Sequence, residues 1–200
     1  MGCNMKLITL QHKDVLNDII SNGRYECTMI SNYHKESPKI YKILANRLGL
    51  SDGVYPIFTW AYLDNKPVSL NSETVTSANS KVPLKIKDYY AFELEVPDDK
   101  TDLQDFYAFA ATKSDEYEFE IDPKAEMFTC DIGEVANIQC TIPEIRNEWI
   151  RAVYNMNEEK VLFDFKTVGV FNESFREKFN IPDVVKSERT QVELKEMQLF

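Results

Sequence analysis

The chain has 200 residues, of which 33 are acidic and 23 are basic, giving a formal net charge of −10 at pH 7. This length suits one ordinary domain, which buries enough apolar surface to fold without disulfides or a structural metal. Lysine and arginine form no long cluster, which argues against a surface that binds nucleic acids directly. No apolar run approaches the roughly 20 residues of a membrane helix and no secretory signal is recognisable, so we expect a cytoplasmic protein without membrane contact.

The first predicted elements are a strand and two helices. Residues 6–11, KLITLQ, have the β-forming composition of a short buried strand. Asp14 is predicted to cap a helix with one apolar face, which ends at Gly23. Ser37, followed by a proline, predicts the start of a second amphipathic helix that ends at Gly49. The apolar faces consist of Val15, Leu16, Ile19 and Ile20 in the first helix, and of Ile40, Tyr41, Ile43, Leu44 and Leu48 in the second.

The segment 55–63, YPIFTWAYL, is the most distinctive part of the sequence because it is so rich in aromatic residues. Its aromatic and β-branched content predicts a strand, in which side chains alternate between two faces that are both largely apolar. One face would hold Tyr55, Ile57, Thr59, Ala61 and Leu63, and the other Phe58, Trp60 and Tyr62. We therefore expect a core strand covered on both sides, and prefer this interpretation to a ligand-stacking platform. Residues 64–67 are predicted to form a turn, and residues 69–81 a polar surface loop.

Four further elements are predicted between residues 88 and 154. Residues 88–97 alternate as a strand, and residues 116–121 form an exposed strand in which acidic and apolar residues alternate. Asp102 is predicted to cap a short helix, and residues 141–144 have the capping-box spacing that begins a strongly amphipathic helix. The strand 88–97 would place on one face Tyr90, Phe92, Leu94 and Val96. The short helix would carry Leu103, Phe106 and Phe109 or Ala110. The amphipathic helix would bury Ile145, Trp149, Ile150, Val153 and Tyr154.

The C-terminal part is predicted to contain a strand over residues 161–171, interrupted by Gly169, and a short helix over 173–179. Residues 189–200 add an edge strand or stay loose. Strands and helices follow one another without regular βαβ alternation, which predicts an α+β fold: a single compact domain with a mixed, mostly antiparallel sheet packed against amphipathic helices. The predicted organisation is an N-terminal extension at 1–4, the domain at 5–180, and a C-terminal tail at 181–200 that either adds the edge strand or stays loose.

The sequence lacks the motifs of common catalytic and metal sites. Its six glycines are scattered and form neither of the phosphate-binding loops G-x-G-x-x-G and G-x-x-x-x-G-K. Its four cysteines form no C-x-x-C pair, so we expect reduced thiols and no metal site. His12 and His34, the only histidines, are interpreted as surface residues rather than catalytic bases, and Glu93 and Glu95 as part of a solvated strand face. No cofactor is therefore predicted.

Several short motifs follow one another along the chain to about Phe171: residues 5–11 (MKLITLQ), 23–25 (GRY), Tyr41, 55–62 (YPIFTWAY), 94–97 (LEVP), Trp149 and 161–163 (VLF). In this order they resemble an uncharacterised bacterial and phage family known only as a domain of unknown function. Phe58 stands where many members have tryptophan, and residues 181–200 have no clear counterpart in the family. The resemblance implies a cytoplasmic bacterial or phage protein and brings no established activity, cofactor or catalytic residue.

A looser likeness concerns the order of the first elements. A strand that ends in polar residues, a helix, and then a glycine followed by an aromatic residue resembles the start of ADP-ribosyltransferase-like NAD-binding folds. Those folds usually carry Arg or His on the first strand and a glutamate late in the chain. In this sequence Gln11, with His12 beside it, takes the strand position, and the late glutamate is unidentified. The likeness implies a cleft near Gln11, Tyr25 and Trp60.

Two classes of function are left open by the sequence. The first is an acidic, non-enzymatic binding or regulatory protein that acts through protein–protein contacts, with a phage inhibitor of a basic, nucleic-acid-binding defence protein as a special case. The second is an enzyme that uses NAD. Homo-oligomer formation also stays open. If a ligand pocket exists, the side chains expected to line it are Gln11, Tyr25, Tyr55, Trp60 and Tyr62.

Overall fold

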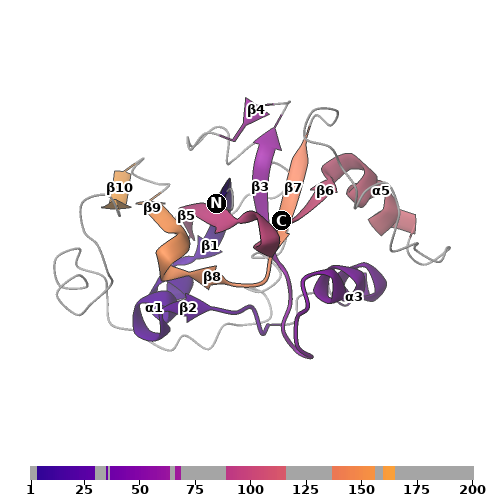
Figure 1. Ribbon diagram of the computed structural model, residues 1–200, viewed down its shortest axis with the longest axis horizontal. Helices are drawn as coiled ribbons and strands as arrows, with labels where there is room; N and C mark the ends of the chain where they lie inside the picture. Colours follow the sequence, from indigo (N-terminus) through magenta and orange to yellow (C-terminus); the bar gives the residue numbers. More distant parts are fainter. Residues whose placement is uncertain are drawn as a thin grey trace.

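The computed structural model describes residues 4–29, 35, 37–63, 66–68, 89–115, 137–155 and 160–164 of the chain. The labels η2 and η4 denote short 3-10 helices. In chain order, the elements are β1 (Asn4–His12), α1 (Lys13–Asn22), β2 (Arg24–Tyr25), α3 (Pro38–Arg47), β3 (Ile57–Leu63), β4 (Lys66–Pro67), β5 (Tyr89–Pro97), η2 (Asp98–Lys100), β6 (Asp102–Asp105), α5 (Phe106–Asp115), β7 (Ile138–Ile142), β8 (Ile145–Arg146), η4 (Asn147–Trp149), β9 (Ile150–Asn155) and β10 (Lys160–Asp164) (Figure 1).

One sheet organises these elements. It has eight strands in the order β10-β9-β5-β1-β3-β7-β6, with β4 paired to β3, while β2 and β8 form a separate two-stranded ribbon. β1 lies in the middle and pairs with β5 along its whole length, from Asn4 opposite Pro97 to His12 opposite Tyr89. Every pairing between described strands is antiparallel, which together with the helices confirms the predicted α+β class.

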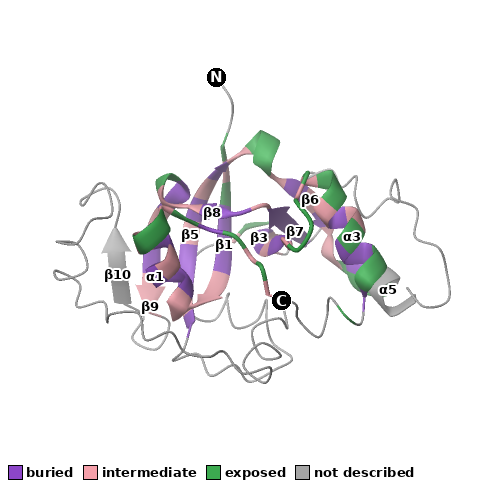
Figure 2. Cartoon of the chain, turned by 90° about the horizontal axis from the view of Figure 1, so that it is seen from below, coloured by how far each residue is buried: buried purple, intermediate pink, exposed green. Residues whose placement is uncertain are grey.

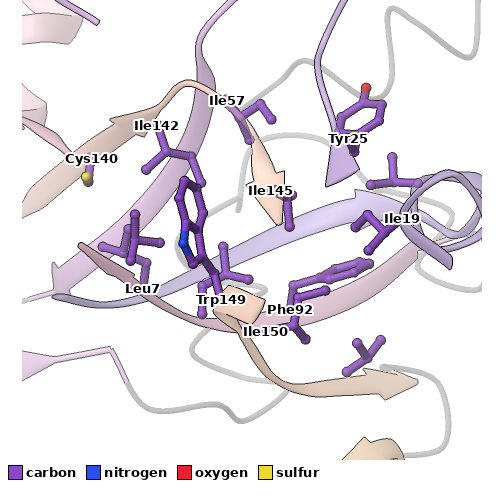
Figure 3. Close-up of a cluster of buried hydrophobic side chains, with 14 of the residues drawn as sticks. Leu7, Ile19, Tyr25, Ile57, Phe92, Cys140, Ile142, Ile145, Trp149 and Ile150 are labelled. Carbon is purple, nitrogen blue, oxygen red and sulfur yellow. The ribbon is translucent and has the colours of Figure 1, made fainter. Parts of the chain in front are cut away.

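The largest cluster of buried side chains lies between α1 and one face of the sheet. Leu16 and Ile19 of α1 are at most 1% exposed, and they pack in one cluster with Leu7 of β1 and Phe92 of β5. Figure 3 shows Trp149 in the same cluster, together with Tyr25 and Ile145 from the β2–β8 ribbon. The apolar face predicted for the first helix is therefore confirmed as the helix's contact with the core.

Helices α3 and α5 cover the opposite face of the sheet at β3. Ile57 and Phe58 are neighbours on this strand, so their side chains point to opposite faces. Ile57 belongs to the α1 cluster, whereas Phe58 packs against α3 and against Phe109 of α5. In Figure 2, buried and exposed residues alternate along α3, and α5 lies beside it. The sheet is thus layered between α1 with the ribbon on one face and α3 with α5 on the other.

The end of α1 is fixed by Gly23, as predicted. Gly23 adopts a left-handed conformation with φ of 75°, and its N–H donates to the carbonyl of Ile19 at 2.7 Å. A residue with a Cβ atom is strained at such a φ, even though no heavy atom lies within 4 Å of the position that this Cβ would take.

Gly23→Ala is accordingly expected to lower the free energy of unfolding by about 1 kcal/mol, measured by urea denaturation. Gly23→Asn is the matched control, because asparagine tolerates the left-handed region better than alanine. Equal losses for the two variants would show that backbone strain is not the cause.

The start of α1 differs from the prediction, because His12 rather than Asp14 occupies the N-cap. β1 continues to His12, and the Nδ1 atom of this residue accepts a hydrogen bond from the backbone N–H of Asp14 at 3.4 Å. Asp14 instead lies in the first turn, where its negative charge interacts favourably with the positive end of the helix dipole. α3 begins as predicted after Ser37, although the side chain of Ser37 makes no capping hydrogen bond.

The predicted helix start at Asp102 is wrong. Residues Asp102–Asp105 form strand β6, which pairs with β7, and α5 begins at Phe106. Oδ1 of Asp105 accepts hydrogen bonds from the backbone N–H groups of Tyr107 at 2.9 Å and Ala108 at 3.2 Å, so this residue caps the helix. Both Asp102 and Asp105 have the side-chain chemistry of a helix cap. Asp105 is the cap because Asp102 is the first residue of a strand that pairs with β7.

The predicted helix that begins at residues 141–144 is also wrong. The stretch completes β7 and then forms β8, η4 and β9. Four apolar residues expected on the helix face are nevertheless buried in the α1 cluster: Ile145, Trp149, Ile150 and Val153. The β-branched residues among them favour strands, and the pairing of β9 with β5 satisfies the backbone of this segment.

The remaining predictions concern short or undescribed segments. Lys66 and Pro67 form strand β4 opposite Tyr62 and Leu63, not the predicted turn, while residues 64–65 of that turn lie outside the described residues. β10 confirms a strand at the start of the predicted segment 161–171. The other predictions that lie outside the described residues concern 69–81, 116–121, the part of 161–171 beyond Asp164, 173–179 and 181–200.

Candidate functional site

The aromatic strand β3 is covered on both faces, as predicted. Trp60 is 9% exposed, and its ring centroid lies 4.9 Å from that of Phe106 at the start of α5. The ring of Phe58 lies 5.5 Å from that of Tyr41 on α3 and 5.8 Å from that of Phe109 on α5. These contacts are edge-on or tilted ring packing of the kind found in protein cores.

A bulge in β3 corrects the predicted face of Tyr62. The pairing of β3 with β7 shifts by one residue between Trp60 and Tyr62. Tyr62 therefore packs against the α1 cluster that contains Ile57 and Ala61, not on the side of Phe58 and Trp60. An extra residue reverses the alternation of a strand, and the sequence carries no signal for it here.

The other predicted ligand residues lie in structural contacts. Nε2 of Gln11 donates to Oγ1 of Thr9 at 2.8 Å. Tyr25 is 8% exposed within the α1 cluster (Figure 3). Tyr55 is half-buried, and its N–H donates to the carbonyl of Cys27 at 2.8 Å.

The structure does not bring Gln11 and Trp60 to one face of the sheet. Ile8 lies directly opposite Trp60 and so shares its face, and Gln11 is three residues further along the same strand. An odd number of steps along a strand leads to the opposite face. The NAD-binding cleft suggested for Gln11, Tyr25 and Trp60 therefore has no common surface on this sheet, and a ligand role for each residue stays a prediction.

A pocket of about 410 Å³ opens at the C-terminal end of α3, and we call it the α3–β6 pocket. Its volume lies in the range of small-molecule sites. Three separate segments form its wall: the end of α3, the η2–β6 segment, and the turn between β7 and β8. The lining residues are Arg47, Leu48, Asp99, Lys100, Thr101, Asp102 and Pro143.

A bidentate ion pair forms one wall of this pocket. Nε of Arg47 donates to Oδ2 of Asp102 at 2.8 Å, and Nη2 donates to Oδ1 at 2.6 Å. The side chain of Asp102 is 11% exposed and that of Arg47 is 32% exposed. Hydrogen bonding to Asp102 raises the pKa of Arg47 above its ordinary value, against the opposing effect of burial. The guanidinium is thus held charged and in one orientation.

The rim of the α3–β6 pocket carries one further charge of each sign. Nζ of Lys100 lies 3.8 Å from Oδ2 of Asp99, and both side chains are largely exposed. Such a lining suits a small polar ligand that offers both donors and acceptors. Sequence reasoning missed this pocket because its residues are scattered over three segments without a motif.

A second charged cluster joins the two strands of the ribbon. Arg24 and Arg146 lie directly opposite one another on β2 and β8. The buried Glu144 accepts a hydrogen bond from Nε of Arg146 at 2.6 Å, and its Oε2 lies 3.7 Å from Nη1 of Arg24. This hydrogen bond is the main reason that the pKa of Arg146 is raised. Because one carboxylate offsets the repulsion between two arginines, we interpret the cluster as structural.

The described part of the chain contains no group of His, Cys, Asp and Glu side chains arranged to hold a metal ion. Among the described residues, Cys27 and Cys140 are not joined in a disulfide. Across the same residues, no helix combines the length and apolar character needed to span a membrane. Comparison of the chain with protein-family models, curated proteins and solved structures finds no match. The resemblance to an uncharacterised bacterial and phage family therefore stays a prediction.

Proposed function

We propose that this chain is a regulatory binding protein that recognises a basic region of another protein. The distribution of charge along the chain carries the proposal. Acidic and basic side chains are almost equal in number over the described residues, whereas the segment 116–136, between α5 and β7, is strongly acidic. Against Lys124, this segment has Glu116, Glu118, Glu120, Asp122, Glu126, Asp131 and Glu134. Charge of one sign steers partners of the opposite sign and contributes to specificity.

Ion pairing within the described residues supports this proposal. Arg47 pairs with Asp102, Arg146 with Glu144, and Nε of Arg151 with Oε2 of Glu95 at 2.7 Å. Each of these pairs balances its charge within the fold. The net negative charge of the chain therefore comes mainly from the segment 116–136 and not from the body of the sheet.

An exposed tyrosine on α5 also supports a protein interface. Tyr107 on α5 is 61% exposed, and no other large hydrophobic side chain is exposed among the described residues. Its hydroxyl accepts a hydrogen bond from Nδ2 of Asn137 at 3.1 Å, and Asn137 directly follows the acidic segment. Tyrosine is enriched among the residues that dominate binding energy at protein interfaces. An exposed aromatic side chain, bonded to the residue that follows an acidic stretch of sequence, suits a basic partner.

A special case of this function is an inhibitor that occupies the nucleic-acid-binding surface of a defence protein. Such surfaces are basic because they neutralise phosphates, so an acidic protein can compete for them. The resemblance to a bacterial and phage family motivates this case and a cytoplasmic location.

The proposal is tested by binding of a fluorescently labelled lysine-rich peptide, followed by anisotropy at low and high salt. Neutralising three acids of the segment, Glu116→Gln, Glu118→Gln and Glu120→Gln together, should raise Kd by about tenfold at low salt. Binding to the unaltered chain should weaken strongly at high salt, because exposed charges are screened.

The matched control neutralises three acids outside the segment: Asp52→Asn, Asp98→Asn and Asp99→Asn. This variant has the same net charge as the first, and its Kd should stay within about twofold of the unaltered chain. Equal weakening by the two triple variants would mean that net charge alone causes binding, and would contradict the proposal. Binding that is insensitive to salt would contradict it as well.

A further inference from the structure

The two faces of the sheet differ in chemistry where β7 and β6 form its end. The face toward α1 is apolar and carries Ile138, Cys140 and Ile142 of β7, all 0% exposed. On the opposite face, polar residues stand in directly opposed pairs. They are Asp102 opposite Thr141 and Gln104 opposite Gln139, and all four are buried. Gln139 in turn lies opposite Trp60 of β3.

Two amide atoms in these pairs lack a hydrogen bond. Nε2 of Gln104 donates to the carbonyl of Asp102 at 2.7 Å and to Oγ1 of Thr141 at 3.1 Å, but Oε1 of Gln104 is buried without a partner. Gln139 is 3% exposed, and its Nε2 is also buried without a partner. A buried donor or acceptor that has lost water and gained no partner destabilises the state in which it is buried.

Helix α5 packs on this side of the sheet in a small apolar cluster that is separate from the α1 cluster: Phe109 and Ala108 belong to it together with Ile40, Tyr41 and Leu44 of α3. The helix starts directly after β6, and the N–H of Phe106 donates to the carbonyl of Asn137 at 3.1 Å. Its rings reach back to β3, where Phe106 contacts Trp60 and Phe109 contacts Phe58. By contrast, α3 is tied to β6 by the bidentate pair of Arg47 and Asp102. The helix that begins directly after β6, beside the unpaired amides, thus packs in a cluster of buried side chains much smaller than the α1 cluster.

We propose that α5 opens from the sheet as a unit, without unfolding of α1 and the central strands, and that the unpaired amides promote this opening. Water reaches Gln104 and Gln139 in the open state and satisfies both orphan atoms, and the ring of Trp60 becomes accessible. In the closed state, the apolar contacts of Phe106 and Phe109 with β3 and α3 offset the unpaired amides. Local opening of this kind occurs in segments with few buried apolar contacts. The proposal does not depend on what the acidic segment binds.

Amide hydrogen exchange of the full chain, resolved by residue, tests the proposal. Backbone amides of α5 should exchange at least about tenfold faster than those of α1 and depend less steeply on denaturant, because the open state exposes less surface than the unfolded chain. Gln139→Met keeps the length of the side chain and removes the orphan donor. It should slow exchange of α5 by about tenfold.

Asn17→Leu is the matched control. Asn17 on α1 is 6% exposed and also has a buried atom without a partner, Oδ1. Figures 1 and 2 show α1 and α5 on opposite sides of the molecule. This variant should leave exchange of α5 unchanged, since α1 stays folded in the open state. Equal exchange of α5 and α1 in the unaltered chain would overturn the proposal, and so would unchanged or faster exchange of α5 in Gln139→Met. The second result would show instead that the two glutamines pair with each other in the closed state.

Discussion

Phe92→Ala is expected to lower the free energy of unfolding by about 3–5 kcal/mol, the usual cost of emptying a large aromatic site in a core. Phe92 is 0% exposed and lies on β5 between Thr9 of β1 and Val153 of β9. Strands pair on both sides of it and the α1 cluster covers it, so the surrounding backbone cannot collapse into the space. The free energy of unfolding of single domains is about 5–15 kcal/mol, so the variant loses a large share of the protein's stability. Urea denaturation measures the loss.

Tyr107→Ala provides the comparison for this prediction. It also removes an aromatic ring, but one that is 61% exposed, and it should cost about 1 kcal/mol or less. If Phe92→Ala proves too unstable to purify, Phe92→Leu should lose an intermediate amount, because most of the site stays filled. Similar losses for Phe92→Leu and Tyr107→Ala would show that burial at Phe92 does not dominate stability.

The position of Phe92 also shows which parts of the fold the sequence predicts. Strand β5 alternates without interruption, and α1 and α3 have clear apolar faces with glycines at or just after their ends, so local pattern and tertiary contacts agree. The α+β class follows from the order of such elements. These elements form the middle of the sheet and two of the helices that cover it.

Prediction failed where tertiary pairing overrides a local pattern. Ile145, Trp149 and Val153 have helical spacing, yet they reach the same core from β8, η4 and β9. Asp102 has the chemistry of a helix cap, yet it is held in β6 by pairing with β7 and by the ion pair with Arg47. Strand pairing and ion pairs between distant segments cannot be predicted from a window of a few residues.

The candidate site illustrates the same limit. The covered position of the aromatic strand was predictable from its composition, because both of its faces are apolar. The face of Tyr62 was not, since it depends on a bulge opposite β7. The α3–β6 pocket was not predictable either, because Arg47, Asp99 and Pro143 meet only after three segments have folded together.

Breaking the ion pair in the wall of the α3–β6 pocket is expected to cause the second large loss of stability. Arg47→Met should lower the free energy of unfolding by about 2–3 kcal/mol, because it leaves the carboxylate of Asp102, only 11% exposed, without its cation. Asp102→Leu should cost less, about 1 kcal/mol, since the partly exposed guanidinium can turn toward water. The double variant should lose less stability than the sum of the two single losses. Urea denaturation of the four proteins gives the difference, which is the coupling free energy between Arg47 and Asp102.

This coupling should not change between pH 7 and pH 9. Asp102 raises the pKa of Arg47 in the folded state, so the stabilisation is fully present below the ordinary pKa of arginine and is lost only as the pH rises through the raised value. Both measurements lie below that range, where the guanidinium stays charged in the folded and unfolded chain. Additive losses, or a larger loss for Asp102→Leu than for Arg47→Met, would show that the pair does not lock α3 to β6. The wall of the pocket would then depend on strand pairing alone.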